Sequence, residues 1–136
     1  MKLNLLLLSA LVAGCAVAPR STPLPAGDAE LLGEGVLSTA ANDYNPSLSP
    51  DGRTLAFARS QPDFRHARIL VSRLQRGRWT PPQPVPFVDA DRSDSDPTWA
   101  PDGRTLYFIS DRPAPGRDSA RTDLDLWRVA YTDGRW

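Results

Sequence analysis

Short apolar runs, each preceded by a tight polar turn, set the pattern of this chain. The runs TLAFA at 54–58 and TLYFI at 105–109 have the composition of strands. A Pro-Asp-Gly triplet precedes each run: Pro pre-sets φ for a turn, Asp can bond its own backbone, and Gly adopts positive φ without steric cost. The pattern predicts two turns that lead into strands, with the turn residues Pro50, Asp51, Gly52, Pro101, Asp102 and Gly103.

A second pair of apolar segments predicts a hairpin after each of these strands. Residues 69–79, ILVSRLQRGRW, correspond to residues 126–136, LWRVAYTDGRW. The offset between the copies grows from 51 to 57 residues, and the extra length falls in 111–123. That stretch is rich in Pro, Gly, Arg and Asp, so it suits a surface loop. Four short strands per copy, without helical periodicity between them, predict an all-β fold.

The chain contains an internal repeat. Residues 43–57 and 94–108 are identical at nine of fifteen positions. Self-similarity with a period of about 20 to 50 residues is typical of solenoids and propellers. Because four antiparallel strands per repeat correspond to one propeller blade, we expect about two β-propeller blades, an incomplete propeller. The blades are predicted at 42–88 and 93–136, within a repeat region at 31–136.

The repeat resembles a known family. The run PSLSPDGRTLAF and its partner PTWAPDGRTLYFISDR resemble the TolB-type β-propeller repeat of bacterial envelope proteins. The resemblance covers residues 42–136 and implies a propeller fold with protein partners in the periplasm. It does not specify the function, because proteins with this repeat include periplasmic scaffolds, lipoproteins joined to a peptidoglycan-binding domain, and propellers that cap peptidases.

The N-terminus has the pattern of a bacterial lipoprotein signal. After Met1-Lys2, an apolar run at 3–12 is too short to span a bilayer as a helix, and it ends in LVAGC. This run resembles a lipobox, which implies cleavage before Cys15 and lipidation of Cys15, and the following Ala16 implies the outer membrane, facing the periplasm. We therefore expect a signal peptide at 1–14 and a Pro/Ala-rich tether at 15–30. An ordinary secretory signal and a buried N-terminal helix are the alternatives.

Charge gives no general case for a nucleic-acid partner, because 16 basic residues balance 16 acidic ones. The Arg-rich stretch at 65–78 is interpreted as a solvated hairpin face, with binding of an acidic partner as the alternative. The aspartates at 89–96 lack the Gly and Glu that an EF-hand loop requires, so no metal site is predicted there, and a bound divalent cation is the alternative.

Three tryptophans are interpreted from their place in the repeat. Trp99 takes the position of Leu48 in the other copy, which favours a core position. Trp79 and Trp136 are repeat partners that each follow Gly-Arg, and we expect them to cover the edge of a blade. Stacking of a sugar on an exposed tryptophan is the alternative.

The sequence contains no recognised catalytic motif. His66 is the sole histidine and Cys15 the sole cysteine. Neither a G-x-S-x-G elbow, nor an H-E-x-x-H motif, nor a Gly-rich phosphate loop occurs. On this basis we predict no catalytic residues, no cofactor, and a chain that is not an enzyme.

The leading hypothesis is a non-catalytic envelope lipoprotein that binds or scaffolds other envelope proteins through its blades. Residues 15–136 amount to 122 residues. A complete propeller needs about four to eight blades, so this length suits only two. Two expectations follow: copies of the chain complete a ring as a homo-oligomer, or the chain is a truncated remnant of a longer propeller protein, peptidoglycan-binding or peptidase-associated, without independent function.

Overall fold

The computed structural model describes residues 27, 29–89, 91–117 and 123–136. Within these ranges the fold consists of two antiparallel sheets and no helix, which confirms the predicted all-β class. The predicted signal peptide at 1–14, Cys15 and most of the tether at 15–30 lie outside the described residues. In the described part of the chain, no helix has the length and apolar character needed to cross a membrane.

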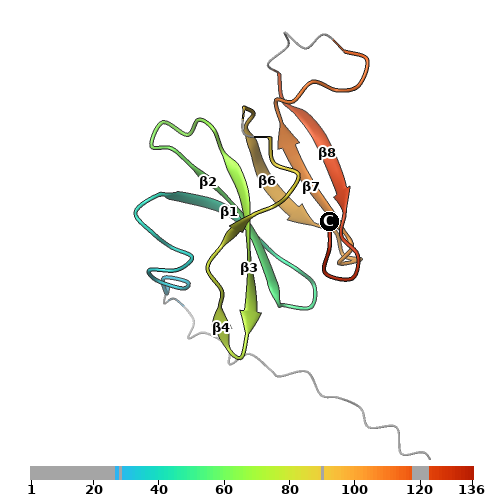
Figure 1. The fold of residues 1–136 in the computed structure, drawn as a ribbon. Helices are drawn as coiled ribbons and strands as arrows, with labels where there is room; N and C mark the ends of the chain where they lie inside the picture. The colour runs from blue at the N-terminus through green and yellow to red at the C-terminus, as the bar shows by residue number, and fades with distance from the viewer. Residues whose placement is uncertain (1–26, 28, 90, 118–122) are drawn as a thin grey trace, which may run out of the picture.

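The first sheet contains the first copy of the repeat. Its strands are β1 (Asn42–Leu48), β2 (Thr54–Ser60), β3 (Arg68–Gln75), β4 (Arg78–Trp79) and β5 (Gln83–Pro84). Their order is β1-β2-β3-β4 (Figure 1). Strand β5 pairs with β3. The first Pro-Asp-Gly turn joins β1 to β2, so the strand predicted at 54–58 forms where the turn pattern places it.

The second sheet contains the second copy. Its strands are β6 (Asp94–Trp99), β7 (Thr105–Ser110) and β8 (Asp125–Ala130), in the order β6-β7-β8. The second Pro-Asp-Gly turn joins β6 to β7, and β8 is the first strand of the hairpin predicted at 126–136. β1 and β6 each carry a bulge at the same place in the repeat.

In that later hairpin a single bridge joins Thr132 to Arg135, the repeat counterparts of Gln75 and Arg78, which pair in the first sheet. The rings of Tyr131 and Trp136 pack 4.6 Å apart, and both contact Trp99, with centroid distances of 5.3 and 5.5 Å. The described part of the second sheet has three strands and this bridge, where the sequence predicts four strands.

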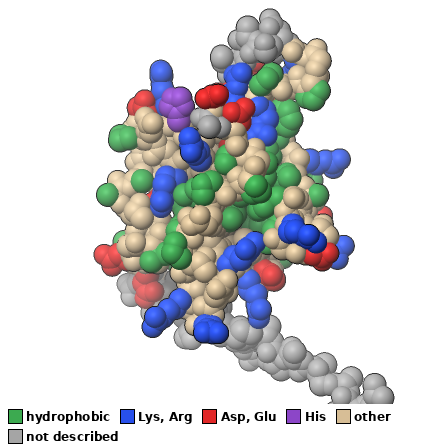
Figure 2. Space-filling view, in the orientation of Figure 1, with side chains coloured by type: hydrophobic (Ala, Val, Ile, Leu, Met, Phe, Trp, Pro, Cys, Tyr) green, Lys and Arg blue, Asp and Glu red, His purple; other side chains and the backbone are tan. Residues whose placement is uncertain are grey.

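Two apolar clusters hold the fold together. One fills the space between the sheets. Figure 2 shows hydrophobic side chains gathered at the surface in the middle of the view. The buried members of this first cluster are Ala56, Ile69, Val85, Trp99, Leu106 and Phe108. The other lies on the opposite face of the first sheet, where Leu37 and Trp79 cover Leu55, Phe57 and Leu70. Burial of each Leu, Ile or Phe side chain stabilises the fold by about 1.5–3 kcal/mol.

The sheets stack in the same sense, like successive units of one repeat. Leu106 and Phe108 of the second sheet pack on Ala56 and Ile69 of the first, yet their own repeat counterparts, Leu55 and Phe57, lie on the far face of the first sheet. β1 lies against β6, which brings the first strands of the two sheets together (Figure 1). Corresponding features of the two repeats are therefore neighbours in space.

Candidate functional site

The two Pro-Asp-Gly turns lie side by side. Gly52 and Gly103 have φ angles of 70° and 65°, in the left-handed region that favours glycine. A Cβ atom on Gly103 would lie 3.7 Å from Cδ of Pro50, so the turns are in contact. Together with the C-terminal turn they line a hollow of about 320 Å³. Its walls are Ser49, Pro50, Asp51, Thr54, Asp102, Gly103, Arg104, Tyr131, Thr132 and Asp133.

The two aspartates of this hollow accept hydrogen bonds from their own turns. Asp51 accepts the hydroxyl of Ser49 at 2.6 Å and the amide of Arg53 at 3.0 Å. These bonds, that of Ser49 foremost, lower the pKa of Asp51. Asp102 accepts the amide of Arg104 at 2.8 Å, and this bond likewise lowers the pKa of Asp102. Both carboxylates are ionised at neutral pH. The hydrogen bonds within each turn explain why an aspartate stands at each of these positions.

A second hollow lies where β1 meets β6. The bulges put two non-glycine residues in the left-handed region, Asn45 with φ of 50° and Asp96 with φ of 53°. The amide of Asn45 donates to the carboxylate of Asp96, and the backbone N–H of Trp99 donates to the hydroxyl of Ser47 at 3.0 Å. The hollow has a volume of about 440 Å³, and its other lining residues are Pro46, Pro97 and Thr98. We call it the bulge hollow.

The bulge hollow has a structural role as well as a polar surface. β1 and β6 are edge strands, and a bulge with a proline prevents an edge from pairing freely with other chains. The left-handed residue in each bulge is Asn or Asp, which tolerate that conformation best after glycine. What remains available is an amide donor beside a carboxylate acceptor. The sequence carries a signal for this pair, Asn-Pro and Asp-Pro at corresponding positions, which the sequence analysis did not single out as a site.

The aspartates at 89–96 do not converge on one point. Asp89 accepts the backbone amide of Asp91 at 3.0 Å, while Asp96 belongs to the bulge hollow. Asp94 is fully buried and accepts two hydrogen bonds from Arg112, at 2.7 and 2.8 Å. Among the described residues, no three His, Cys, Asp or Glu side chains are grouped as a metal site would require.

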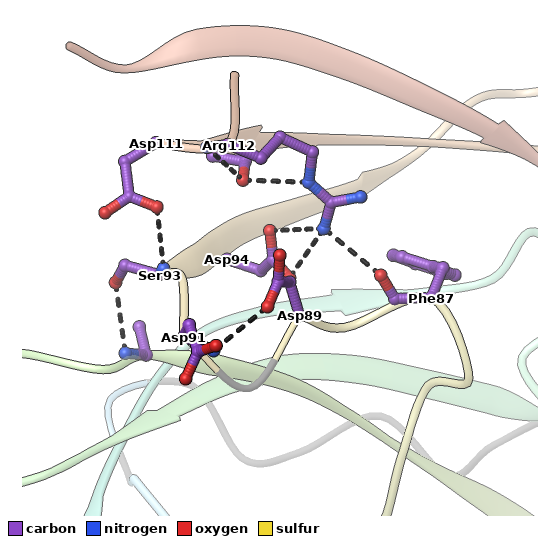
Figure 3. A network of polar contacts seen from close by, with 9 residues as sticks. Phe87, Asp89, Asp91, Ser93, Asp94, Asp111 and Arg112 are labelled. Atoms are coloured by element: carbon purple, nitrogen blue, oxygen red, sulfur yellow. Dashed lines mark hydrogen bonds and ion pairs between the residues drawn. The ribbon is translucent and has the colours of Figure 1, made fainter. Parts of the chain in front are cut away.

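Arg112 is the centre of a structural network. Figure 3 shows its guanidinium directed at Asp94 and at the carbonyl of Phe87, which accepts a bond at 3.2 Å. Its Nε donates to Ser110 at 3.0 Å, and its guanidinium lies 5.2 Å from the ring centroid of Phe108. The first repeat has a more exposed version of this pair, in which Arg59 bonds Asp43 at 2.6 Å and lies over Phe57.

The fold and these hollows define this protein as an all-β repeat chain with two sheets. Comparison with known proteins bears on its function. No family model matches the chain. The uncharacterized peptidase YuxL of Bacillus subtilis is 36% identical over 72 residues, which is 50% of this chain and 10% of that protein. Dipeptidyl-peptidase 5 of Porphyromonas gingivalis is 25% identical over 115 residues, 82% of this chain and 15% of that protein.

These relatives correct one prediction. The sequence analysis predicts that the chain is not an enzyme, but both relatives are named as peptidases, so that prediction is wrong. The absence of known motifs misled the prediction because such motifs report only the part of a protein in which they occur. The chain matches no more than about a seventh of either relative's length.

Proposed function

We propose that this chain takes part in peptide hydrolysis as the β-propeller portion of a peptidase-type protein. The observation that carries the proposal is the match to Dipeptidyl-peptidase 5, which extends over 82% of the chain. The match therefore includes sequence from both repeats. The activity of the relative is the reason to expect peptides as the substrate class.

The stacking of the sheets supports the propeller interpretation. Successive blades of a propeller pack face to face in the same sense around a central axis. The two sheets of this chain pack in that way, and their first strands, β1 and β6, lie together. In such an arrangement the bulge hollow belongs to the inner strands, which line the axis. The envelope location and the lipid anchor at Cys15 form part of the same proposal and rest on the sequence of residues 1–16.

The bulge hollow has the chemistry to contact a peptide. A peptide presents carbonyl acceptors and N–H donors, and a free N-terminus adds a positive charge. Asn45 supplies a donor and Asp96 an acceptor, and the two side chains lie within hydrogen-bonding contact of each other. Asn45 is exposed and Asp96 only half-buried. A peptide can therefore reach both side chains and replace the hydrogen bond between them with hydrogen bonds to its own backbone.

A graft tests the proposal. The 115-residue stretch that matches Dipeptidyl-peptidase 5 is transplanted from this chain into that relative, and hydrolysis of fluorogenic dipeptides is measured. We expect a folded, active graft. Asn45→Ala with Asp96→Ala should raise KM about tenfold with kcat unchanged, as for a lost hydrogen bond to a charged group. Arg78→Ala, on the exposed strand β4, is the control.

One result of this experiment would overturn the proposal, and another would overturn only the role given to the bulge hollow. One is a graft that folds, by circular dichroism, yet is as inactive as the relative with the stretch deleted. The other is a graft whose KM is indifferent to the two bulge substitutions, which would remove the hollow from the proposal and leave the propeller as a support only.

A further inference from the structure

The two-residue turn of the β3–β4 hairpin carries a residue that its backbone conformation does not favour. Arg76 and Gly77 both have positive φ, 51° and 77°, as a type I′ turn requires. The corresponding turn of the second repeat, Asp133-Gly134, has nearly the same angles, 51° and 78°. Asp tolerates this conformation better than most residues other than glycine. The first repeat therefore places an arginine where the turn itself favours an aspartate or asparagine.

The hairpin as a whole is more positive than its counterpart. Its exposed cations are Arg73, Arg76 and Arg78, which we call the hairpin arginines. In the second repeat, the offset of 57 residues puts Ala130 in place of the first and Asp133 in place of the second, and keeps arginine only at the third. The turn closes in both repeats, so its closure does not require the positive charge.

The hairpin arginines keep their charge uncompensated. Within the part of the chain that the structure describes, none of the three forms an ion pair. Arg73 donates only to neutral groups, the hydroxyl of Tyr131 at 3.1 Å and the carbonyl of Gly134 at 3.2 Å. The neighbouring turns are balanced in themselves, because each of their aspartates stands two residues before an arginine. These pairs are Asp51 with Arg53, Asp102 with Arg104, and Asp133 with Arg135.

The hairpin lies at one end of the molecule. Figure 1 shows β4 and the tip of the hairpin at the lower end of the first sheet, opposite the loop between β2 and β3. Figure 2 shows several Lys and Arg side chains at the same end. Because the hairpin projects along the strand direction, further sheets stacked on either face of this one would leave its tip exposed.

The N-terminal segment joins the fold near this end. Leu32 and Leu55 line a common apolar pocket, and the carbonyl of Arg53 accepts the amide of Leu74 from β3 at 2.8 Å. Cys15, the expected site of lipidation, precedes Leu32 by 17 residues, 32 minus 15. A chain of that length spans at most about 60 Å when fully extended. A domain anchored at Cys15 therefore stays close to the bilayer, and its anchor enters at the positive end.

We propose that the hairpin arginines contact the anionic phospholipid headgroups of the membrane that carries the anchor, and so orient the domain on its surface. Arginine binds phosphate through two parallel hydrogen bonds, and each basic residue near an anionic bilayer strengthens binding about fivefold. A planar surface suits charges on a projecting tip, which line none of the hollows described above. Three charges alone bind weakly, so the lipid holds the chain while the arginines set its orientation. The proposal rests on the envelope location proposed above and not on the peptidase role.

Vesicle flotation tests the proposal on the full chain with Cys15→Ser, so that no lipid contributes. The vesicles contain phosphatidylcholine with about 30% phosphatidylglycerol, in about 20 mM salt, where screening is weak. We expect binding to these vesicles, none to pure phosphatidylcholine, and loss of binding at about 300 mM salt. Arg76→Asp should weaken binding at least tenfold, and it keeps the turn residue found at Asp133. The control is Arg65→Asp, the same change of charge at an arginine that is 80% exposed in the loop between β2 and β3.

Three results would overturn the proposal. The first is absence of binding to the anionic vesicles at low salt. The second is equal weakening by Arg76→Asp and Arg65→Asp, because the attraction would then follow net charge and not the hairpin. The third is tighter binding to soluble polyglutamate than to the vesicles, which would assign the arginines to an acidic protein partner. Failure of the proposed location is distinguishable, because mass spectrometry of the wild-type chain would then show Cys15 without lipid.

Discussion

Replacement of Arg112 by methionine should remove the ion pair that this residue forms with Asp94 in the second repeat. Arg112 is the ion-pair partner of Asp94, whose side chain is fully buried. The substitution keeps an apolar side chain of similar length over Phe108 and Trp127, so the lost interactions are mainly polar. What remains is a buried carboxylate without its cation.

The magnitude follows from the burial of the two partners. Removal of one member of a buried ion pair costs about 3–5 kcal/mol, because the remaining charge stays uncompensated. Arg112 retains 19% side-chain exposure, so water can reach the site, and we expect the lower end, about 3 kcal/mol. The matched variant is Arg59→Met. Its pair with Asp43 is more exposed, at 29% and 13%, and we expect a loss of about 1 kcal/mol.

Urea unfolding followed by tryptophan fluorescence measures both losses, and Trp127, beneath Arg112, reports on the site directly. For a slope of about 1.5 kcal/mol per molar urea, the midpoint of Arg112→Met should fall by roughly 2 M. Asp94→Asn should remove most of the penalty of Arg112→Met in a double variant. A loss below about 1 kcal/mol for Arg112→Met, or an equal loss for Arg59→Met, would refute the reasoning from burial.

Three further predictions concern the turns and the anchor. Gly52→Val should destabilise the fold by about 2 kcal/mol in urea unfolding, since its φ is 70° and no neighbour crowds the new side chain; wild-type stability would contradict the turn assignment. The turn lowers the pKa of Asp51 in the folded protein, so the stability that the ionised carboxylate contributes is present above the ordinary pKa and is lost as the pH falls through the folded value. When the pH is lowered below about 4, Asp51→Asn should therefore lose less stability than wild type. Parallel curves of unfolding free energy against pH for the two proteins would contradict this. Cys15→Ser should abolish partition into the membrane fraction, and unchanged partition would contradict lipid anchoring.

The sequence predicts best where local chemistry decides the structure. The Pro-Asp-Gly turns and the strands behind them appear in the structure. Each is determined by residues within a few positions of one another. The contact of Trp136 with Trp99 could not be predicted in this way, because it joins residues far apart in the chain.

The candidate sites were harder to predict because they depend on how the repeats stack. Nothing in the spacing of Asn45 and Asp96 shows that they touch, and their contact arises only because β1 lies against β6. Likewise the sequence leaves a cation at the aspartates of 89–96 as an alternative, whereas the fold pairs Asp94 with Arg112. Sequence spacing fixes distances along a strand, but contacts between sheets follow from the packing of their faces.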